Sequence, residues 1–199
     1  MLQNSNRNNA ICKKILTLIR NYYYIDFNTI KRFLHYDVGC IKFVLNDLIR
    51  DKIIKVSVID NHKYYYQGNK DALIDGNSAY DITLCLTVLS ELKKYYKIRQ
   101  HTMFPFPQTV KYVIGSKTDN TDEAYGEIMR LSESNLDRAI YMYHPTHLNV
   151  NVERIIVLDE KSRSLLNQKQ YINDSIGPVK MYALIDKDYN VSYQGGLDE

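Results

Sequence analysis

The chain has 199 residues, 45% of them hydrophobic, and a formal net charge of +3. This apolar content can fill one large core or two small ones, so a disordered chain is not expected. No apolar run approaches the ~20 residues of a membrane span, and the polar first residues lack the apolar middle of a secretory signal. We therefore expect a cytoplasmic globular protein without a membrane partner.

The charge is unevenly distributed along the chain. Residues 1–70 hold 12 Lys+Arg against 5 Asp and no Glu, a net of +7, whereas residues 71–199 hold 14 against 18, a net of −4. Such an asymmetry indicates a polyanionic partner for the basic part. The cysteines are three and far apart, which fits reduced thiols in a reducing compartment.

Two helices with a short strand between them are predicted at the start. Residues 10–21 carry apolar side chains at helical spacing, and residues 22–25 are aromatic and β-branched, as in a strand. Asp26 has the side chain to cap the next helix, whose buried face would include Ile30, Phe33 and Leu34.

A third helix is predicted over residues 38–51, after a break at residues 35–37 in which Asp37 is the candidate cap. Its inward stripe would be formed by five apolar residues: Ile41, Val44, Leu45, Leu48 and Ile49. Its opposite side would be formed by Gly39, Lys42, Phe43, Asn46 and Arg50.

A β-hairpin follows the third helix. Ile54, Val56 and Val58 alternate with polar residues, residues 60–62 have turn chemistry, and residues 63–66 form an aromatic strand. Three helices and a hairpin in this order are typical of a winged helix-turn-helix domain, which we assign to residues 1–70. The same element order occurs in protein-interaction domains that bind no nucleic acid.

If the domain binds double-stranded DNA, its third helix is expected in the major groove. Lys42 and Asn46 lie one helical turn apart, and an asparagine amide can pair with adenine while a lysine reaches guanine or a phosphate. Gly39 would allow close approach of the backbone to a phosphate. The expected DNA-binding residues are therefore Gly39, Lys42, Phe43, Asn46 and Arg50 on the helix and Asn61, His62 and Lys63 at the hairpin tip.

The remainder is predicted as a mixed α/β domain over residues 78–199, after a polar linker at residues 67–77, so the fold class of the chain is α+β. The expected helices are residues 78–98, 136–143 and 160–168. The expected strands are residues 108–115, 124–131, 154–158, 179–185 and 190–193.

The element order resembles the plasmid replication-relaxation family and its relatives from mobile elements, whose back domain is similar to PD-(D/E)XK nucleases. The fragments that carry the resemblance are Phe106-Pro107-Gln108 and Gly126-Glu127-Ile128-Met129. Gln108 stands where such a nuclease has an acidic residue, and Met129 stands where it has a lysine. The resemblance therefore implies the fold without the chemistry, because a lone Glu127 would hold Mg²⁺ poorly.

No other pattern indicates catalysis. His144 and His147 are close together but lack the further ligands of a zinc site, and no phosphate-binding glycine loop is present. We expect no catalytic residue, metal or cofactor. The sequence favours a non-catalytic DNA-binding protein of a bacterial mobile element, acting in regulation, replication or transfer, as a homodimer or with a replication or conjugation protein. The alternatives are a metal-dependent nuclease and a protein-interaction adaptor.

Overall fold

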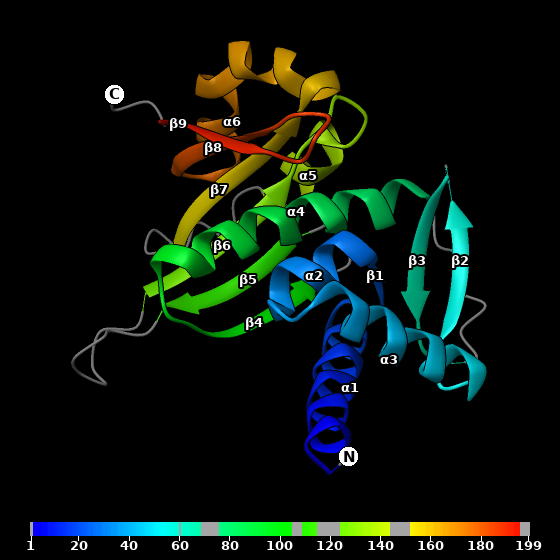
Figure 1. The fold of residues 1–199 in the computed structure, drawn as a ribbon. Coiled ribbons are helices and arrows are strands. Elements are labelled where there is room, and N and C mark those ends of the chain that lie inside the picture. Colours follow the sequence, from blue (N-terminus) through cyan, green and yellow to red (C-terminus); the bar gives the residue numbers. More distant parts are fainter. Residues whose placement is uncertain are drawn as a thin grey trace. The chain divides into compact units, whose positions relative to one another are not determined.

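The computed structural model describes residues 2–59, 61–68, 76–104, 109–114, 124–143 and 152–195. These residues form helices and two separate β-sheets, so the fold class is α+β, in agreement with the sequence (Figure 1). The chain divides into two compact units, Met1–Thr83 and Leu84–Glu199. The division falls inside the helix α4 (Gly76–Tyr95), and residues 69–75 of the predicted linker lie outside the described residues.

Unit 1 contains three complete helices, the first part of α4 and a three-stranded sheet. The elements are α1 (Leu2–Tyr22), β1 (Tyr24–Asp26), α2 (Phe27–Leu34), α3 (Val38–Arg50), β2 (Lys55–Ile59) and β3 (His62–Tyr66). The sheet order is β1-β3-β2, and both pairs of strands are antiparallel. The predicted elements of this region are confirmed in kind and order, but the first helix begins eight residues earlier than its apolar pattern indicated and includes Tyr22, so the strand predicted over residues 22–25 begins at Tyr24.

Two aspartates begin the helices α2 and α3, as predicted. The Asp26 carboxylate accepts hydrogen bonds from the backbone N–H groups of Asn28 (3.3 Å) and Thr29 (3.0 Å). The Asp37 carboxylate accepts one from Cys40 N–H at 3.1 Å. Each bond satisfies a backbone donor that has no partner inside the helix. His35 ends α2 in the left-handed conformation, with φ of 51°, so the chain turns before α3 begins.

The core of unit 1 lies between its helices and sheet. α1 contributes Ile11, Ile15, Leu18 and Ile19, and α3 contributes Ile41, Val44, Leu45 and Leu48, all buried. Ile49 was expected in the same stripe, but this was wrong: its side chain is 36% exposed. Ile49 lies at the edge of the apolar arc near the end of the helix, where the core no longer covers it.

The hairpin has the predicted alternation, but its two valines face outward. The cross-strand pairs Ser57↔Tyr64 and Val58↔Lys63 place Tyr64 and Val58 on opposite faces of the sheet. Tyr64 is buried, whereas Val58 is 62% exposed and Val56 is also exposed. One face of the hairpin is therefore core, and the other is an apolar surface.

Unit 2 is built around a six-stranded mixed sheet with the order β4-β5-β6-β7-β8-β9. The strands are β4 (Ile98–Phe104), β5 (Thr109–Ile114), β6 (Ala124–Arg130), β7 (Val152–Asp159), β8 (Val179–Ile185) and β9 (Val191–Gly195); the helices are α5 (Leu136–Tyr143), the 3₁₀-helix η1 (Glu160–Gln168) and α6 (Lys169–Ile176). β6, β7 and β8 are parallel to one another, and the remaining pairs are antiparallel.

One face of this sheet packs against α5, η1 and α6. The buried cluster contains side chains of β6, β7 and β8 and of the three helices: Met129, Leu131, Leu136, Ala139, Ile156, Leu158, Leu165, Ile172, Ile176, Val179 and Tyr182. β7 lies at the centre, as its apolar sequence predicted. On the opposite face, the carboxyl-terminal part of α4 lies near β4 and β9, since Lys93 acts electrostatically on His101 and Glu91 acts on Tyr193.

One predicted helix of unit 2 was too long, and two elements were not predicted. The helix predicted over residues 78–98 spans Gly76–Tyr95, and Ile98, the last residue of the predicted range, begins the unpredicted strand β4. The helix predicted over residues 160–168 is confirmed as the 3₁₀-helix η1, and α6 follows it without having been predicted. Both misses concern polar segments: β4 reads IRQHTMF and α6 reads KQYINDSI, so neither shows a strong hydrophobic period.

Among the described residues, no helix is long and apolar enough to cross a membrane.

Candidate functional site

The exposed side of α3 presents the five residues that the sequence singled out. At about 100° of rotation per residue, Gly39, Lys42, Phe43, Asn46 and Arg50 fall within an arc of about 100°. All five are exposed, and Phe43 is 55% exposed despite being aromatic. The buried residues of α3 occupy the opposite arc. α3 therefore buries one face in the core of unit 1 and exposes the opposite face.

Lys42 and Gly39 each lie close to a residue at the start of a helix. Lys42 Nζ lies 5.7 Å from the centre of the Phe27 ring, at the beginning of α2, in a cation–π contact. A Cβ atom on Gly39 would lie 3.0 Å from Asp37 Oδ1, the carboxylate oxygen that caps α3. Glycine at this position thus leaves room for the cap as well as for close approach from outside.

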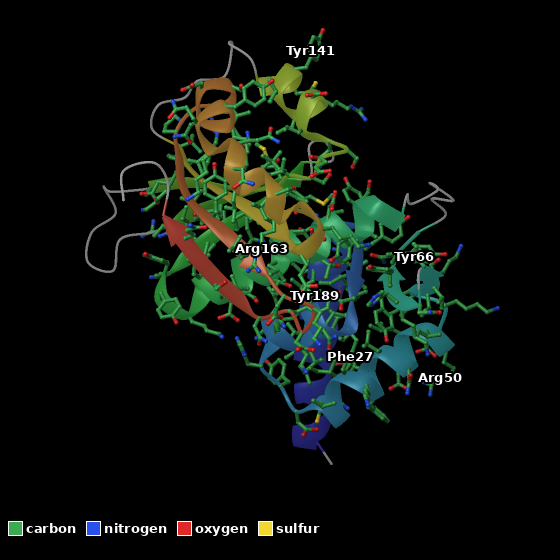
Figure 2. All side chains as sticks on the ribbon, turned by 90° about the horizontal axis from the view of Figure 1, so that it is seen from above. Phe27, Arg50, Tyr66, Tyr141, Arg163 and Tyr189 are labelled. Carbon is green, nitrogen blue, oxygen red and sulfur yellow. The ribbon has the colours of Figure 1, made fainter. Side chains whose placement is uncertain are left out.

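Arg50 is exposed but already engaged with two carboxylates. Its Nη1 lies 2.8 Å from Asp47 Oδ1, and its Nε lies 3.2 Å from Asp51 Oδ1. The hydrogen bond to Asp51 and the charges of both aspartates raise the pKa of the guanidinium. Figure 2 shows Arg50 at the carboxyl end of α3, with Phe27 at the start of α2.

The net charge around α3 is consequently small. Residues 37–51 hold three aspartates against Lys42 and Arg50, a net of −1. The positive charge of this unit therefore lies on other elements. Exposed cations are found on α1 (Lys13, Lys14, Arg20), α2 (Lys31), after α3 (Lys52) and on the hairpin (Lys55, Lys63).

The hairpin tip is exposed at all three of its predicted site residues. Asn61 adopts the left-handed conformation, with φ of 64°, which asparagine tolerates better than most residues. His62 and Lys63 follow at the start of β3, where they pair with Ile59 and Val58 of β2. Asp60 lies outside the described residues. The tip thus presents an amide, an imidazole and an ammonium group next to exposed Val58.

Lys14 reinforces the turn between α2 and α3. Its Nζ donates a hydrogen bond to Tyr36 Oη at 3.1 Å and lies 4.9 Å from the centre of the Tyr36 ring. This cation of α1 is therefore held beside the turn that leads into α3. Sequence reasoning missed this contact, because the two residues are 22 positions apart and no local pattern links them.

Glu127 of β6 forms a buried ionic cluster in unit 2. Arg154 Nε lies 3.1 Å from Glu127 Oε2, and both side chains are only 2% exposed. Lys111 Nζ lies 3.4 Å from Glu127 Oε1, with half of its side chain exposed. The strand register explains the cluster, because Lys111 and Arg154 are the cross-strand neighbours of Glu127 on β5 and β7.

This cluster compensates the carboxylate with two cations. A metal ion at Glu127 would have to compete with both of them, and Met129 contributes only an apolar, buried side chain. Gln108 lies outside the described residues. Among the residues that are described, no group of three or more His, Cys, Asp and Glu side chains is placed to hold a metal ion. His144 and His147 are outside this part of the chain.

A second buried ion pair fixes the carboxyl ends of β6 and β7. Arg130 Nη2 lies 2.9 Å from Asp159 Oδ1, and Arg130 Nη1 donates to Ser162 Oγ at 2.7 Å and to the carbonyl oxygen of Val157 at 3.1 Å. The Asp159 carboxylate also accepts a hydrogen bond from Ser162 N–H, as the cap of η1. The groups are mutually satisfied, which is typical of a structural network.

His101 of β4 has a pKa well below the ordinary value of a histidine. Partial burial on β4, together with the positive charge of Lys93, lowers the pKa of His101 to about 4. The imidazole is therefore neutral near pH 7. Burial also raises the pKa of Tyr193 on β9, to about 12, so the phenol of this tyrosine is neutral near pH 7.

Models of known protein families give no match to this chain, and no curated protein matches it either.

Proposed function

We propose that the chain binds double-stranded DNA through a winged helix-turn-helix in unit 1. The observation that carries the proposal is the open face of α3, where Gly39, Lys42, Phe43, Asn46 and Arg50 are all exposed. A helix whose apolar side is buried and whose polar side is free has the form required of a helix that enters the major groove. The β2–β3 hairpin would be the wing.

The distribution of charge in unit 1 supports different roles for α3 and for the surrounding cations in this binding. Since the residues around α3 sum to −1, most of the attraction to phosphates has to come from cations on other elements, such as Lys63 at the hairpin tip and Lys13 and Arg20 on α1. Contacts to phosphate position a protein on the duplex, whereas contacts to base edges give specificity. α3 would thus read bases, while the lysines and arginines around it would hold the backbone.

One double variant and one matched control variant test this proposal. Lys42→Ala/Asn46→Ala removes one exposed cation and one exposed amide from α3. Lys161→Ala/Asn167→Ala removes the same two groups from exposed positions on η1. Gel shifts with mixed genomic duplexes at about 50 mM and about 200 mM salt should show binding that weakens steeply with salt. The α3 variant should bind at least about tenfold more weakly, and the η1 variant should bind as the unmodified chain does. Equal binding by both variants would contradict the docking of α3.

For unit 2 we propose a non-catalytic role with a fold like that of PD-(D/E)XK nucleases. The compensation of Glu127 by Arg154 and Lys111 supports it, because a carboxylate with two cationic partners is a poor ligand for Mg²⁺. Unit 2 would then form a homodimer or recruit a replication or conjugation protein. The resemblance to the plasmid replication-relaxation family supports a regulatory or accessory role on a mobile element.

A protein-interaction adaptor is the second candidate, and the exposed valines of the hairpin favour it. Val56 and Val58 face outward, beside Lys63. Apolar side chains on an open strand face are suited to contact with another protein. Absence of any salt-sensitive binding to duplex DNA in the gel shifts would favour this candidate over the first.

A further inference from the structure

We infer that the exposed face of α3 selects A·T base pairs over G·C base pairs in the major groove. This inference rests on the proposed function and names the class of DNA site that it would recognise. It follows from which of the exposed side chains are available for base contacts and which are already engaged.

Asn46 and Phe43 are the available base-reading groups. Asn46 lies near the middle of the exposed arc, and within the described residues no hydrogen bond engages its side-chain amide. An amide donates to adenine N7 and accepts from adenine N6, so it pairs with adenine in two places at once. Phe43 is 55% exposed on the same face, and an aromatic ring there can contact the methyl group of thymine. The two side chains together match the two bases of an A·T pair.

Arg50, the side chain best suited to guanine, is compensated by its own helix. Arginine reads guanine through a bidentate contact with O6 and N7. Here Nη1 and Nε of Arg50 already lie within 2.8 Å and 3.2 Å of Asp47 and Asp51. Moving the guanidinium to a base would leave two carboxylates unpaired beside a polyanion, which is electrostatically unfavourable.

Lys42 is the remaining cation on this face, and its position favours a phosphate. Its ammonium group lies over the Phe27 ring, which begins α2. The stem of the side chain therefore runs toward the neighbouring helix, away from the centre of the exposed arc. An ammonium group at the margin of a docked helix is placed for the DNA backbone.

Modified duplexes test the inference without altering the protein. Fluorescence anisotropy would compare equal-length duplexes with A·T or G·C central base pairs, at about 150 mM salt. The A·T duplex should bind about tenfold more tightly or better. Replacing its adenines with 7-deazaadenine removes N7 and should abolish most of this preference. Replacing thymine with uracil removes the methyl group and should cause a smaller loss.

Two protein variants complete the experiment. Asn46→Ala should remove the preference for A·T, and Asp47→Asn/Asp51→Asn, which releases Arg50, should raise affinity for the G·C duplex severalfold. Equal or tighter binding of the G·C duplex, or an A·T preference that survives both 7-deazaadenine and Asn46→Ala, would overturn the inference while leaving DNA binding intact. Failure to bind any duplex would overturn the proposed function together with it.

Discussion

The two units use ion pairs of the same chemistry in opposite ways. In unit 1 the pairs of Arg50 with Asp47 and Asp51 lie at the surface, and the Arg50 side chain is 71% exposed. In unit 2 the pair of Arg154 with Glu127 is almost completely buried. Exposed pairs contribute only about 0–1 kcal/mol to stability, whereas breaking a buried pair costs about 3–5 kcal/mol. The surface pairs of α3 thus add little to stability, while the buried pair of unit 2 holds the sheet together.

The largest expected effect is on the buried pair. Arg154→Ala leaves the Glu127 carboxylate in the sheet interior without its closest cation, and the free energy of unfolding should fall by about 3–5 kcal/mol. Lys111→Ala, which removes the half-exposed partner of the same carboxylate, should cost about 1 kcal/mol or less. Urea denaturation measures both.

A double substitution separates pairing from packing at this position. Glu127→Leu/Arg154→Met replaces both charges with apolar side chains of similar size, and it should recover most of the lost stability. Equal small losses for Arg154→Ala and Lys111→Ala would show that burial does not distinguish these pairs.

The caps of α2 and α3 provide the next test, this time within unit 1. Asp26 is buried and accepts from two backbone N–H groups, whereas Asp37 is exposed and accepts from one. Asp26→Ala should lower the free energy of unfolding by about 1–2 kcal/mol, and Asp37→Ala by about 0.5–1 kcal/mol. The reverse order, measured by urea denaturation, would mean that exposure does not govern how much each cap contributes to stability.

His101 should make the stability of unit 2 depend on pH. Its pKa in the folded chain is about 4, below its ordinary value of 6.5, so the unfolded chain binds the proton first as the pH falls. The contribution of His101 is therefore complete above about pH 6.5 and is lost as the pH falls toward 4. The loss should be on the order of 1 kcal/mol, because the imidazole is partly exposed and solvent screens its charge.

The comparison of unfolding curves for the unmodified chain and His101→Gln isolates this group. The difference between the two free energies of unfolding should change between pH 7 and pH 4.5. A constant difference over this range would show that His101 titrates alike in both states.

The smallest expected change concerns the exposed pairs of α3. Asp47→Asn/Asp51→Asn should leave the free energy of unfolding almost unchanged, because the Arg50 side chain is largely exposed and solvent screens its charge. A large loss of stability, read from the same urea curves, would mean that the pairs of Arg50 help to hold unit 1 together.

The local patterns of the sequence predicted unit 1 well for a physical reason. Asp26 and Asp37 are caps, and caps depend only on the next few backbone N–H groups. The apolar residues of α3, such as Ile41 and Leu45, recur at helical spacing and so identify both faces of the helix. The exposed positions of Lys42 and Asn46 followed directly from that spacing.

The pairings that depend on the tertiary fold were not predictable in this way. Arg154 reaches Glu127 only because β6 and β7 are adjacent and parallel. The outward direction of Val58 depends on the register of β2 with β3. A one-residue shift in register would have turned it toward the core.

The most direct test of the account measures stability and DNA affinity on the same variant. Lys42→Ala/Asn46→Ala should leave the free energy of unfolding within about 0.5 kcal/mol of the unmodified chain, since both side chains are exposed. Its affinity for duplex DNA, measured by fluorescence anisotropy, should fall at least about tenfold. An unchanged affinity in this stably folded variant would contradict the claim that α3 presents its open face to DNA.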